Sequence, residues 1–397
     1  MENRRNFLLI GVVYIGLLVL FSVVQTHAQS SERKIVVFKP GVSVETRTDI
    51  IRSHGARVKT LSHANSEVIL TGGEALRNLE KNPNVLRVED DLIVQAFGAG
   101  EANASAKGKP VPTPPPALDW GINKINGASA WNIASSGPRI KVGVIDTGID
   151  ITHPDLAANI AGGFNAISGG SYTDDNGHGT HVAGIIGALD DGAGVIGVDP
   201  HADLYAIKVL DNNGSGYVSD IIEGLDWAVA NNIQVVNMSL GASKGTQSFA
   251  EAIQRAHAAG IVIVAAAGNN GRGIVSYPAA YPEVIAVAAT DSNDARASFS
   301  NYGPQIDVAA PGVSIYSTYF GGRYAIMSGT SMASPFTAGV AALVLSTPVT
   351  GYDMNGNGIA EPEEVQIKIQ NTSKDLGVFG WDKYFGWGRI NALSAVQ

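Results

Sequence analysis

Residues 261–271 read IVIVAAAGNNG. The first seven positions are all apolar, the run begins with β-branched residues, and it ends abruptly at a glycine and two asparagines. A half-exposed strand alternates apolar and polar residues, whereas a short and continuous apolar run is typical of a strand covered on both faces, as in a parallel sheet. This stretch therefore predicts a buried central strand of an α/β protein.

Four other runs of the same character follow one another along the C-terminal part of the chain: KVGVID (141–146), LYAIKVL (204–210), IQVVNMSL (233–240) and VIAVAAT (284–290). Helical spacing occurs between some of them, in VSDIIEGLDWAVANN (218–232) and TQSFAEAIQRAHAAG (246–260). Strands that alternate with helices predict a doubly wound, mostly parallel sheet with helices on both faces, here over residues 118–397. In such sheets ligands bind beyond the carboxyl ends of the strands.

A smaller α+β unit is predicted before this sheet. Its expected strands and helices are KIVVF (34–38), VETRTDIIRSHGA (44–56), SEVILTG (66–72), EALRNLEKNP (74–83) and a final strand NVLRVEDDLIVQAF (84–97). A unit of this size and element order fits a ferredoxin-like arrangement. The segment 98–117, GAGEANASAKGKPVPTPPPA, cannot bury a core, and its composition predicts a linker.

The overall composition narrows the classes of function. The chain has 397 residues, a hydrophobic content of 45%, a formal net charge of −9 and no cysteine. The negative charge argues against nucleic-acid binding, because phosphate backbones require a basic face. Disulfides and thiolate metal sites are excluded. We expect a monomer that gains stability from sources other than disulfides, for example from bound ions.

The first 28 residues have the layout of a secretory signal. Arg4 and Arg5 precede an apolar run from Phe7 to Val24, and short residues lead to a cleavage site after Ala28. The apolar run approaches the length of a membrane span, so an uncleaved membrane anchor is the alternative. Both interpretations place the bulk of the chain outside the cytoplasm.

Four residues of complementary chemistry stand at the predicted ends of strands and helices. Asp146 ends KVGVID, Asn269 ends IVIVAAAGN, His178 begins the apolar stretch HGTHVAGIIGAL, and Ser331 lies in GTSMASP (329–335). Each alone has a simpler explanation as a turn residue or a helix cap. Together they offer a hydroxyl nucleophile, an imidazole base, a carboxylate to orient the imidazole and an amide to stabilise an oxyanion, which is what acyl transfer needs.

The segments DTGID, HGTHVAG, MSLGA, AAAGN and GTSMASP, in this order, resemble the subtilisin family of serine proteases. The resemblance extends from about residue 120 to residue 391. It implies a serine endopeptidase in which Ser331 is the nucleophile, His178 the base and Asp146 the residue that orients His178. Asn269 and the backbone N–H of Ser331 would form the oxyanion hole.

The same resemblance implies how a polypeptide substrate binds. Two backbone edges would pair with an extended substrate, one made by Gly214, Ser215 and Gly216 and the other by Ser239, Leu240 and Gly241. The primary pocket would be lined by Ala266, Ala267, Gly268 and Ser276, with Leu240 and Val218 nearer the upstream subsites. Asn270 stands where some members of the family carry an acidic residue. We therefore expect broad specificity, with large uncharged residues favoured at the cut.

Residues 29–97 resemble the inhibitory propeptide of the family, which assists folding and then occupies the cleft with its carboxyl end. On this interpretation the propeptide is an intramolecular inhibitor, and VEDDLIVQAF presents Phe97 to the primary pocket. Self-cleavage would then fall between Phe97 and Gly98. The alternative is an ordinary α/β interaction module that undergoes no processing.

One motif does not depend on the resemblance. Residues 353–364, DMNGNGIAEPEE, match the EF-hand calcium loop. Side-chain oxygens would come from Asp353, Asn355, Asn357, Glu361 and Glu364, and a backbone carbonyl from Ile359. Gly358 stands at the sharp turn of the loop. The alternative is a polar loop whose acidic residues are there by chance.

The resemblance alone implies a second calcium site. Its side-chain ligands would be Asp155 and Asp191, and its carbonyl ligands would come from Leu189, Ala193 and Val195. The family often adds a glutamine side chain near the mature N-terminus, where this chain has Pro116.

Two other classes of function fit parts of the pattern. A catalytically silent binding protein would have the same fold, but no residue of the catalytic set is missing. An esterase of the α/β-hydrolase type would need a G-x-S-x-G motif and the chain order Ser, Asp, His, and this sequence has neither around Ser331. We therefore expect a secreted, self-processing, calcium-stabilised serine endopeptidase.

Overall fold

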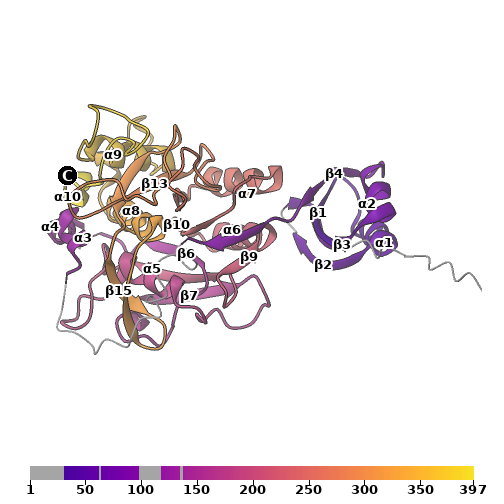
Figure 1. Cartoon of the computed structure of the whole chain (residues 1–397), viewed down its shortest axis with the longest axis horizontal. Coiled ribbons are helices and arrows are strands. Elements are labelled where there is room, and N and C mark those ends of the chain that lie inside the picture. Colours follow the sequence, from indigo (N-terminus) through magenta and orange to yellow (C-terminus); the bar gives the residue numbers. More distant parts are fainter. Residues whose placement is uncertain (1–30, 62–63, 98–117, 135–136) are drawn as a thin grey trace, which may run out of the picture.

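The computed structural model describes residues 31–61, 64–97, 118–134 and 137–397. The predicted signal sequence and linker, with Gly98 and Pro116, lie outside the described residues. Figure 1 shows a small N-terminal unit at one end of a larger one, with a purple strand running from the first into the second. In the part of the chain that the structure describes, no helix combines the length and apolar character needed to cross a membrane.

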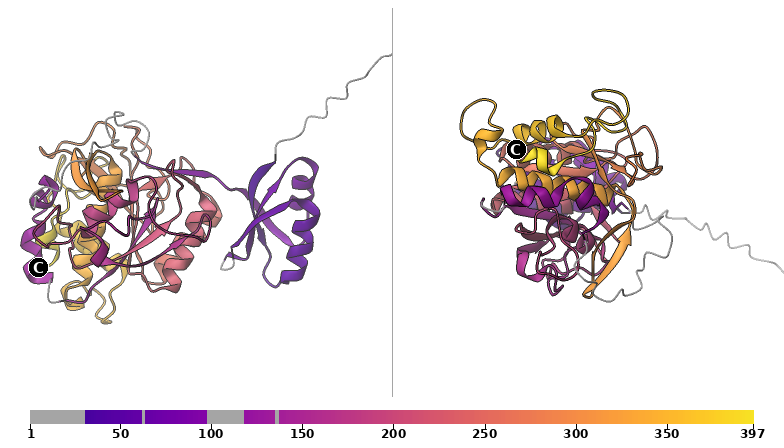
Figure 2. Two further views of the ribbon diagram at one scale, coloured as in Figure 1. Left: turned by 90° about the horizontal axis from the view of Figure 1, so that it is seen from below. Right: turned by 90° about the vertical axis from the view of Figure 1, so that its left-hand side faces the viewer.

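The small unit is a four-stranded antiparallel sheet with two helices on one face (Figure 2). Its elements are β1(Glu32–Phe38), α1(Val44–His54), β2(Ala56–Leu61), β3(Ser66–Thr71), α2(Gly73–Glu80) and β4(Val85–Asp90). The strand order is β2-β3-β1-β4, and all neighbours pair antiparallel. Buried Phe38, Ile51, Ile69 and Leu79 belong to the core of this unit. The ferredoxin-like arrangement predicted from the element order is thus confirmed.

Two features of the small unit differ from the prediction. The sequence does not signal β2, because most of its side chains are exposed and no apolar face marks it as a strand. The single strand predicted over 84–97 is two strands, β4 and β5(Ile93–Ala96), separated at Asp91 and Leu92. β4 pairs with β1, whereas β5 leaves the small sheet and joins the large unit. A continuous β-prone run cannot reveal such a change of partner.

The large unit contains a seven-stranded sheet whose neighbouring strands all pair in parallel. In spatial order its strands are β14(Val308–Pro311), β13(Ile285–Thr290), β12(Val262–Ala266), β10(Val235–Met238), β6(Lys141–Asp146), β8(Asp203–Lys208) and β7(Ile160–Asn165). The five predicted strands are all present. β7 and β14 were not expected from the sequence, since β7 is only partly buried and carries two glycines, and β14 is only four residues long.

Helices cover both faces of the large sheet. On one face lie α5(His178–Gly187) and α8(Thr330–Leu345), and on the other α6(Val218–Ala230) and α7(Gln247–Ala258). Val262 and Val264 of β12 belong to the core on the first face, whereas Ile263 and Ala265 belong to the core on the second. Both faces of the strand are buried, which is why its sequence is apolar at every position. The predicted doubly wound α/β fold is confirmed.

Shorter elements complete the large unit. They are α3(Trp120–Lys124), α4(Gly127–Ala134), α9(Pro362–Thr372), α10(Ala392–Ala395), the 3-10 turns Ala157–Asn159 and Val349–Gly351, and a hairpin of β15(Ile315–Tyr319) and β16(Arg323–Met327). The hairpin packs on α5 through hydrogen bonds from the hydroxyls of Ser317 and Thr318 to the carbonyls of His181 and Thr180. The TYFGGRY turn of this hairpin (318–324) has no explanation from its sequence pattern.

Candidate active site

The carboxyl ends of the central strands bring Asp146 and His178 together. Asp146 is the last residue of β6 and His178 the first of α5, and both are buried. Nδ1 of His178 donates to Oδ1 of Asp146 over 2.8 Å. The same carboxylate oxygen accepts the backbone N–H of Thr147 at 2.7 Å. This is the pairing that the sequence predicted between a carboxylate and an imidazole.

The environment of His178 raises the pKa of its imidazole. Burial works against the charged form and lowers the pKa, but the charge and hydrogen bond of Asp146 outweigh it, with a smaller contribution from the carbonyl of Phe97. The net direction is upward. Three residues further along α5, burial lowers the pKa of His181 to about 3, so that imidazole is neutral. The pKa values of the two histidines of HGTHVAG are therefore shifted in opposite directions, upward for His178 and downward for His181.

Ser331 lies in the first turn of α8, directly after Thr330. Gly329, not Ser331, is the N-cap of this helix. The Ser331 hydroxyl lies within hydrogen-bond distance of two carbonyl oxygens, that of Phe97 and that of Ser239 (3.0 Å), which share its one proton. Ser331 is therefore not a helix cap, and its side chain points to the end of β5.

Phe97 stands between the serine and the histidine. Its carbonyl oxygen lies 3.3 Å from Nε2 of His178 and also accepts the hydroxyl of Ser331. Among the described residues, Ser331 and His178 are hydrogen-bonded to this carbonyl rather than to each other. The direct serine–histidine contact implied by the sequence is thus replaced here by a shared contact with a backbone group of the same chain.

Asn269 lies at the same rim, just after β12. Its Oδ1 accepts the N–H of Thr330 at 2.9 Å and the hydroxyl of Thr330 at 2.8 Å. The amide nitrogen consequently faces the other way. A methyl group placed on Gly329 would lie 3.0 Å from Nδ2 of Asn269 and 3.3 Å from the oxygen of Phe97. The amide and the carbonyl therefore face one small space, which only a glycine at 329 leaves open.

Asp174, which was not predicted from the sequence, organises the loop before His178. Its carboxylate accepts the hydroxyls of Thr147 (2.9 Å) and Thr180 (2.6 Å) and the backbone N–H groups of Asn176 and Gly177. Burial raises the pKa of this carboxyl group. In the segment DDNGHG, the only local indication of this role is an aspartate two residues before an Asn-Gly turn.

The hairpin turn supplies a second contact to this loop. The Tyr319 hydroxyl donates to the carbonyl of Asn176 at 3.1 Å, and its ring lies against Gly177. Gly177 has φ 110°, and a methyl group there would lie 2.3 Å from Cζ of the tyrosine ring. Both the left-handed backbone and the close ring require glycine at this position. This accounts for part of the unexplained TYFGGRY turn.

The two predicted substrate edges hold β5. Two strands flank β5, one on each side and both antiparallel to it: β9(Ser215–Tyr217) and β11(Leu240–Gly241). The register pairs Val94 with Gly216 and Ala96 with Leu240. Two further backbone bonds, from Ala96 N to Gly214 O (2.9 Å) and from Phe97 N to Ser239 O (3.1 Å), extend the pairing to the end of the strand.

The residues expected to line subsites lie around this strand. Val218 and Leu240 are fully buried and belong to the same apolar cluster as Val94 and Ala96. The Phe97 ring lies against Gly241, where a methyl group would approach Cζ to 2.4 Å. Ala266, Ala267, Gly268 and Ser276 form one packed wall, in which Ser276 N donates to Ala267 O at 3.0 Å and a methyl group on Gly268 would lie 2.5 Å from the Ser276 hydroxyl.

The predicted EF-hand loop has backbone bonds that fit a calcium loop. Asp353 accepts the N–H groups of Gly356 (2.6 Å), Asn357 (3.2 Å) and Gly358 (2.9 Å). Both glycines have φ 74°. Glu364 accepts the N–H of Met354 at 2.8 Å. The chain of 353–364 therefore turns around its own oxygen-bearing side chains.

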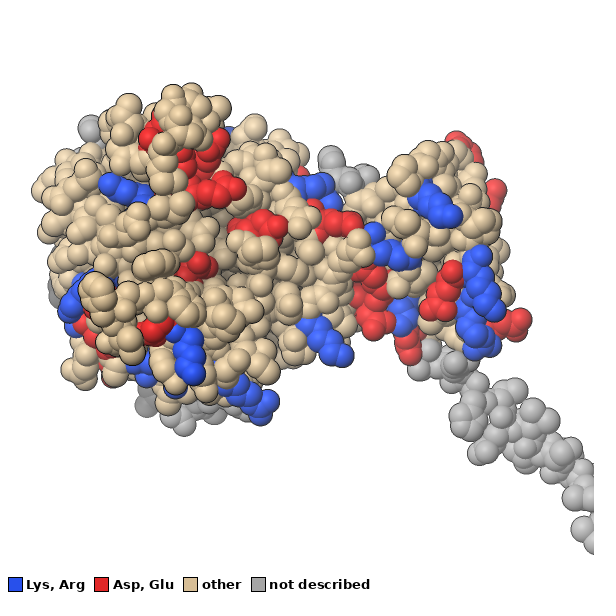
Figure 3. All heavy atoms as spheres, turned by 90° about the horizontal axis from the view of Figure 1, so that it is seen from above, with Lys and Arg blue, Asp and Glu red and all other residues tan. Residues whose placement is uncertain are grey.

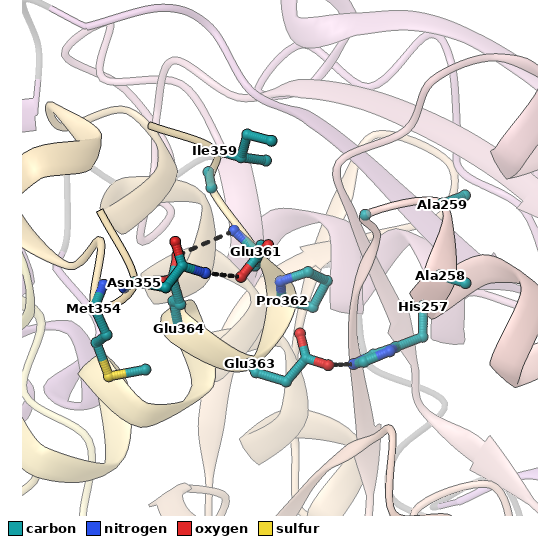
Figure 4. A pocket seen from close by; sticks show the side chains of 12 residues that line it. His257, Ala258, Ala259, Met354, Asn355, Ile359, Glu361, Pro362, Glu363 and Glu364 are labelled. Carbon is teal, nitrogen blue, oxygen red and sulfur yellow. Dashed lines mark hydrogen bonds and ion pairs between the residues drawn. The ribbon is translucent and has the colours of Figure 1, made fainter. Parts of the chain in front are cut away.

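The remaining side chains of this loop are bonded to one another. The amides of Asn355 and Asn357 donate to the carboxylate of Glu361 at 2.7 and 2.9 Å, and Figure 4 shows Asn355 directed at Glu361. A hollow of about 700 Å³ separates this loop from the end of α7, where His257 lies 3.6 Å from Glu363 (Figure 4). Across the described ranges, no three carboxylate or imidazole side chains converge as a metal site built only from them would require. Ile359, the expected carbonyl ligand, is exposed.

The second expected calcium site is built differently. Asp155 is buried and its Oδ2 accepts the N–H of Val195 at 2.8 Å, while its backbone carbonyl accepts the N–H of Leu189 at 2.9 Å. Asp191 and Ala193 are exposed, and Asp191 accepts the N–H of Ala193 at 3.1 Å. Burial and the charge of Asp191 raise the pKa of Asp155 to about 6. The expected residues are thus neighbours, and all of their donor atoms are oxygens.

A parallel α/β sheet that brings a buried aspartate–histidine pair and a serine at the start of a helix to one rim defines a serine hydrolase. An extended strand already lies between the two backbone edges β9 and β11, so the hydrolase is one that cuts polypeptides. Residues 137–388 match the model of the subtilase family, and the chain belongs to this family. It is a serine endopeptidase.

The relatives cover nearly the whole chain. It is 45% identical to the thermostable alkaline protease of Halalkalibacterium halodurans, over 97% of this chain and 98% of that protein. It is 40% identical to subtilisin J of Geobacillus stearothermophilus, over 95% of this chain and 93% of the relative. Subtilisin E of Bacillus subtilis is also 40% identical, over 93% of this chain and 91% of the relative. The similarity therefore includes the small N-terminal unit.

Proposed function

We propose that this chain is a secreted endopeptidase made as a precursor that cuts itself after Phe97. The observation that carries the proposal is the position of the Phe97 carbonyl, which contacts both Ser331 and Nε2 of His178 at the end of a strand held by two backbone edges. A bond to be cut by a serine peptidase must reach this point. The chain delivers its own residue 97 there.

The geometry supports the following roles. Ser331 Oγ attacks the carbonyl carbon of the residue before the cut, and its proton passes to Nε2 of His178. Asp146 holds Nδ1 and stabilises the imidazolium. The negative oxygen is stabilised by Nδ2 of Asn269 and the N–H of Ser331 at the start of α8. His178 then gives its proton to the departing amine, and water, activated by His178, releases the acyl group from Ser331.

Substrate selection follows from the character of the cleft. Pairing with Gly214–Gly216 and Ser239–Gly241 uses backbone groups that every extended peptide has, so it supplies affinity without reading sequence. The Phe97 ring lies against Gly241, which has no side chain, and this arrangement favours a large uncharged residue before the cut. The uncharged Asn270 gives no preference for Lys or Arg. A peptide-library profile dominated by basic residues at this position would contradict the proposal.

The small unit acts as the inhibitor in this proposal. Charged side chains gather on both sides of the junction between the two units (Figure 3). Asp91 accepts the N–H and the hydroxyl of Ser219, at the start of α6, and Glu89 accepts the N–H of Ser248, at the start of α7. Carboxylates at helix N-termini complement the helix dipole. These contacts support a propeptide that holds β5 in the cleft until it is degraded.

We propose calcium as the ligand of the loop 353–364. Its donor set is all oxygen, from Asp353, Asn355, Asn357, Glu361, Glu364 and the Ile359 carbonyl, which is what calcium prefers. The left-handed glycines and the bonds to Asp353 already give the loop its turn. Binding would require the amides of Asn355 and Asn357 to turn their oxygens toward the ion. The ion would stabilise the folded chain by mass action.

A second calcium ion is proposed at Asp155 and Asp191, with carbonyls from Leu189, Ala193 and Val195. The nearness of two carboxylates, one of them buried, supports this site, because a cation would remove their repulsion. Export through residues 1–28 places both sites where calcium is plentiful. Retention of that segment as a membrane anchor stays the alternative, and a monomer is expected.

Ser331→Ala, produced beside the natural chain and a matched Ser334→Ala control, tests the proposal. Ser334 lies on the same helix, is also buried, and its hydroxyl donates to Asn237. We expect Ser331→Ala to fold, to remain full length and to leave casein intact. Ser334→Ala should still shorten itself to a chain that begins at or after Gly98. A Ser331→Ala chain that shortens itself when purified alone would disprove the nucleophile assignment.

A further inference from the structure

Lys208 is a buried cation that the proposed function does not use. It is the last residue of β8, and in the parallel register it stands beside Asp146 on β6. Only 5% of its surface is exposed. Burying a lysine is costly unless its charge is paired and its donors are all bonded. No local pattern distinguishes this residue within the apolar run LYAIKVL.

The ammonium group of Lys208 has a partner for each of its three N–H groups. It donates to the carbonyl of Thr147 (2.7 Å), the carbonyl of Leu210 (2.9 Å) and the carboxylate of Asp175 (2.7 Å). An ammonium has three donors and no acceptor, so this arrangement satisfies it completely. The site therefore satisfies every donor of a lysine ammonium group.

Two of these partners belong to the corner that carries Asp146. Thr147 follows Asp146 directly and donates its N–H to the catalytic carboxylate. The hydroxyl of Thr147 also accepts the N–H of Gly179, next to His178. Leu210 donates its N–H to the carbonyl of Asp146 at 3.1 Å. By fixing the carbonyls of Thr147 and Leu210, Lys208 fixes the backbone on both sides of the Asp146 carboxylate.

The third partner belongs to the segment that carries His178. Asp175 lies three residues before His178, and its side chain is half-exposed, whereas that of Lys208 is buried. A single ammonium group thus joins the end of β6, the end of β8 and the loop that leads into α5. Backbone bonds of Ile149 to Tyr172 and Asp174 also hold this loop to the segment after β6. Lys208 adds a charged tie between the loop, that segment and the end of β8.

We propose that Lys208 is a positioning residue for the Asp146–His178 pair. It contacts neither the serine nor the strand in the cleft, and it acts by keeping the carboxylate aligned with Nδ1. Small misalignments of catalytic groups are costly in rate. The inference rests on the proposed roles of Asp146 and His178, and it fails separately from them, because Asp146→Asn tests those roles without changing Lys208.

Three variants of the full chain test this inference after processing: Lys208→Met, Lys208→Arg and Asp175→Asn. Lys208→Met removes the charge and all three bonds, and we expect kcat to fall on the order of 10- to 100-fold while KM stays unchanged. Lys208→Arg keeps the charge and should recover part of the loss. Asp175→Asn weakens only the half-exposed contact and should cost a few-fold.

The pH dependence of kcat/KM separates positioning from mere stabilisation. If Asp146 is less well aligned in Lys208→Met, the pKa of His178 falls and the acid limb moves to lower pH. The low-field proton resonance of His178 Nδ1–H should move in the same variant. Of the other ionisable groups near His178, Asp174 is unchanged and His181 is neutral. Loss of the Lys208 charge by itself would raise the pKa of His178, so a fall reports misalignment of Asp146.

A Lys208→Met enzyme that melts earlier but keeps the natural kcat, acid limb and proton resonance would show that Lys208 only stabilises the fold. If Lys208→Met does not fold, Asp175→Asn decides. A natural kcat and acid limb in that variant overturn the inference, and a reduced kcat with unchanged KM supports it.

Discussion

The carbonyl oxygen of Phe97 lies 3.3 Å from Nε2 of His178, although 81 positions separate the two residues in the chain. The strand that brings it there, β5, is the middle strand of a three-stranded sheet whose other two members belong to the large unit. Because the small unit continues directly into β5, holding that unit in place also holds residue 97 at the candidate catalytic groups. The proposed inhibition and the proposed self-cleavage would therefore both follow from this one contact.

The first prediction concerns the pH dependence of catalysis. A base must be neutral to accept the proton of Ser331, and Asp146 holds the pKa of His178 above its ordinary value of 6.5. Activity of the mature enzyme should therefore fall as pH drops through this raised pKa. In Asp146→Asn the charge is gone, so the acid limb should move to lower pH and kcat should fall by at least about 10²-fold.

This measurement needs mature enzyme, and Asp146→Asn chains can be processed by added active enzyme in trans. The profile of kcat/KM with a neutral peptide substrate then reports on the free enzyme. An acid limb that stays in place after Asp146→Asn would mean that a group other than His178 titrates there.

The second prediction concerns the calcium loop. Glu364→Gln removes a proposed ligand, whereas Glu363→Gln changes its exposed neighbour, which is not one. In the inactive Ser331→Ala background, saturating calcium should raise the Tm of the parent by about 5–10 °C, which corresponds to a few kcal/mol of ligand binding. Glu364→Gln should lose a large part of this rise and Glu363→Gln should keep it.

Excess chelator is the complementary treatment, and it should lower the Tm of the parent to that of Glu364→Gln or below. If chelator leaves the Tm of the parent unchanged, both proposed calcium sites are wrong. Isothermal titration with calcium alone would then show no binding.

The third prediction concerns release of the small unit. Nζ of Lys59 on β2 reaches into the large unit, where it donates to the carbonyl of Ala166 (2.7 Å) and to Asp220 and Glu223 of α6 (2.5 and 2.8 Å). Lys59→Met leaves these acceptors without their cation, which weakens the contact. After processing of the full chain, we expect the delay before protease activity appears to shorten by on the order of 10-fold.

Lys39→Met, a change at an exposed lysine of the same unit, is the matched control and should have no effect. High salt should accelerate release in the natural chain and have less influence on Lys59→Met, because screening acts on the charges that the variant lacks. Equal release from Lys59→Met and the natural chain at every salt concentration would contradict this role of Lys59.

The fourth prediction concerns stability at acidic pH. Asp307 is partly buried and accepts the N–H of Ala286 at 2.8 Å and the amides of Gln366 and Gln370 on α9. Removal of its carboxyl group from water raises its pKa to about 6. A carboxyl group whose pKa is higher in the folded than in the unfolded chain binds a proton more tightly when folded. Its contribution to stability is therefore present at low pH and is lost as pH rises from about 4 to about 6.

Asp307→Asn removes this titration. Between about pH 4 and pH 6, the free energy of unfolding of Ser331→Ala should fall by on the order of 2 kcal/mol relative to that of Ser331→Ala/Asp307→Asn. Above about pH 6 the two free energies should change with pH in parallel. Urea unfolding at several pH values measures the difference. A difference that does not vary with pH would show that Asp307 titrates alike in both states.

Much of the fold is visible in the sequence for a simple reason. Strands such as β12 are buried on both faces, so their apolar runs are continuous, and both helices predicted between strands are present. The elements missed have weak local signals: β2 is exposed, β14 is short, and the hairpin β15–β16 is defined by its contacts with α5. The division of 84–97 into β4 and β5 depends on two different pairing partners, which no local pattern records.

The candidate site was predicted to a similar extent. Asp146, His178, Asn269 and Ser331 stand in long motifs, so their types and order could be read directly, and their catalytic roles remain proposals. The supporting residues Asp174, Tyr319 and Lys208 could not be found in this way. An aspartate in a turn, a tyrosine in a hairpin and a lysine at a strand end are common, and only their partners distinguish them.

By itself the sequence determined which chemical groups are available and which segments must be buried, because these depend on residue type and short-range periodicity. Tertiary structure alone decided that the carbonyl of residue 97 lies between Ser331 and His178, and that one buried ammonium joins three segments around Asp146. The physical reason is that hydrogen bonds depend on distances of a few ångströms, and folding sets these between residues that are far apart in the chain.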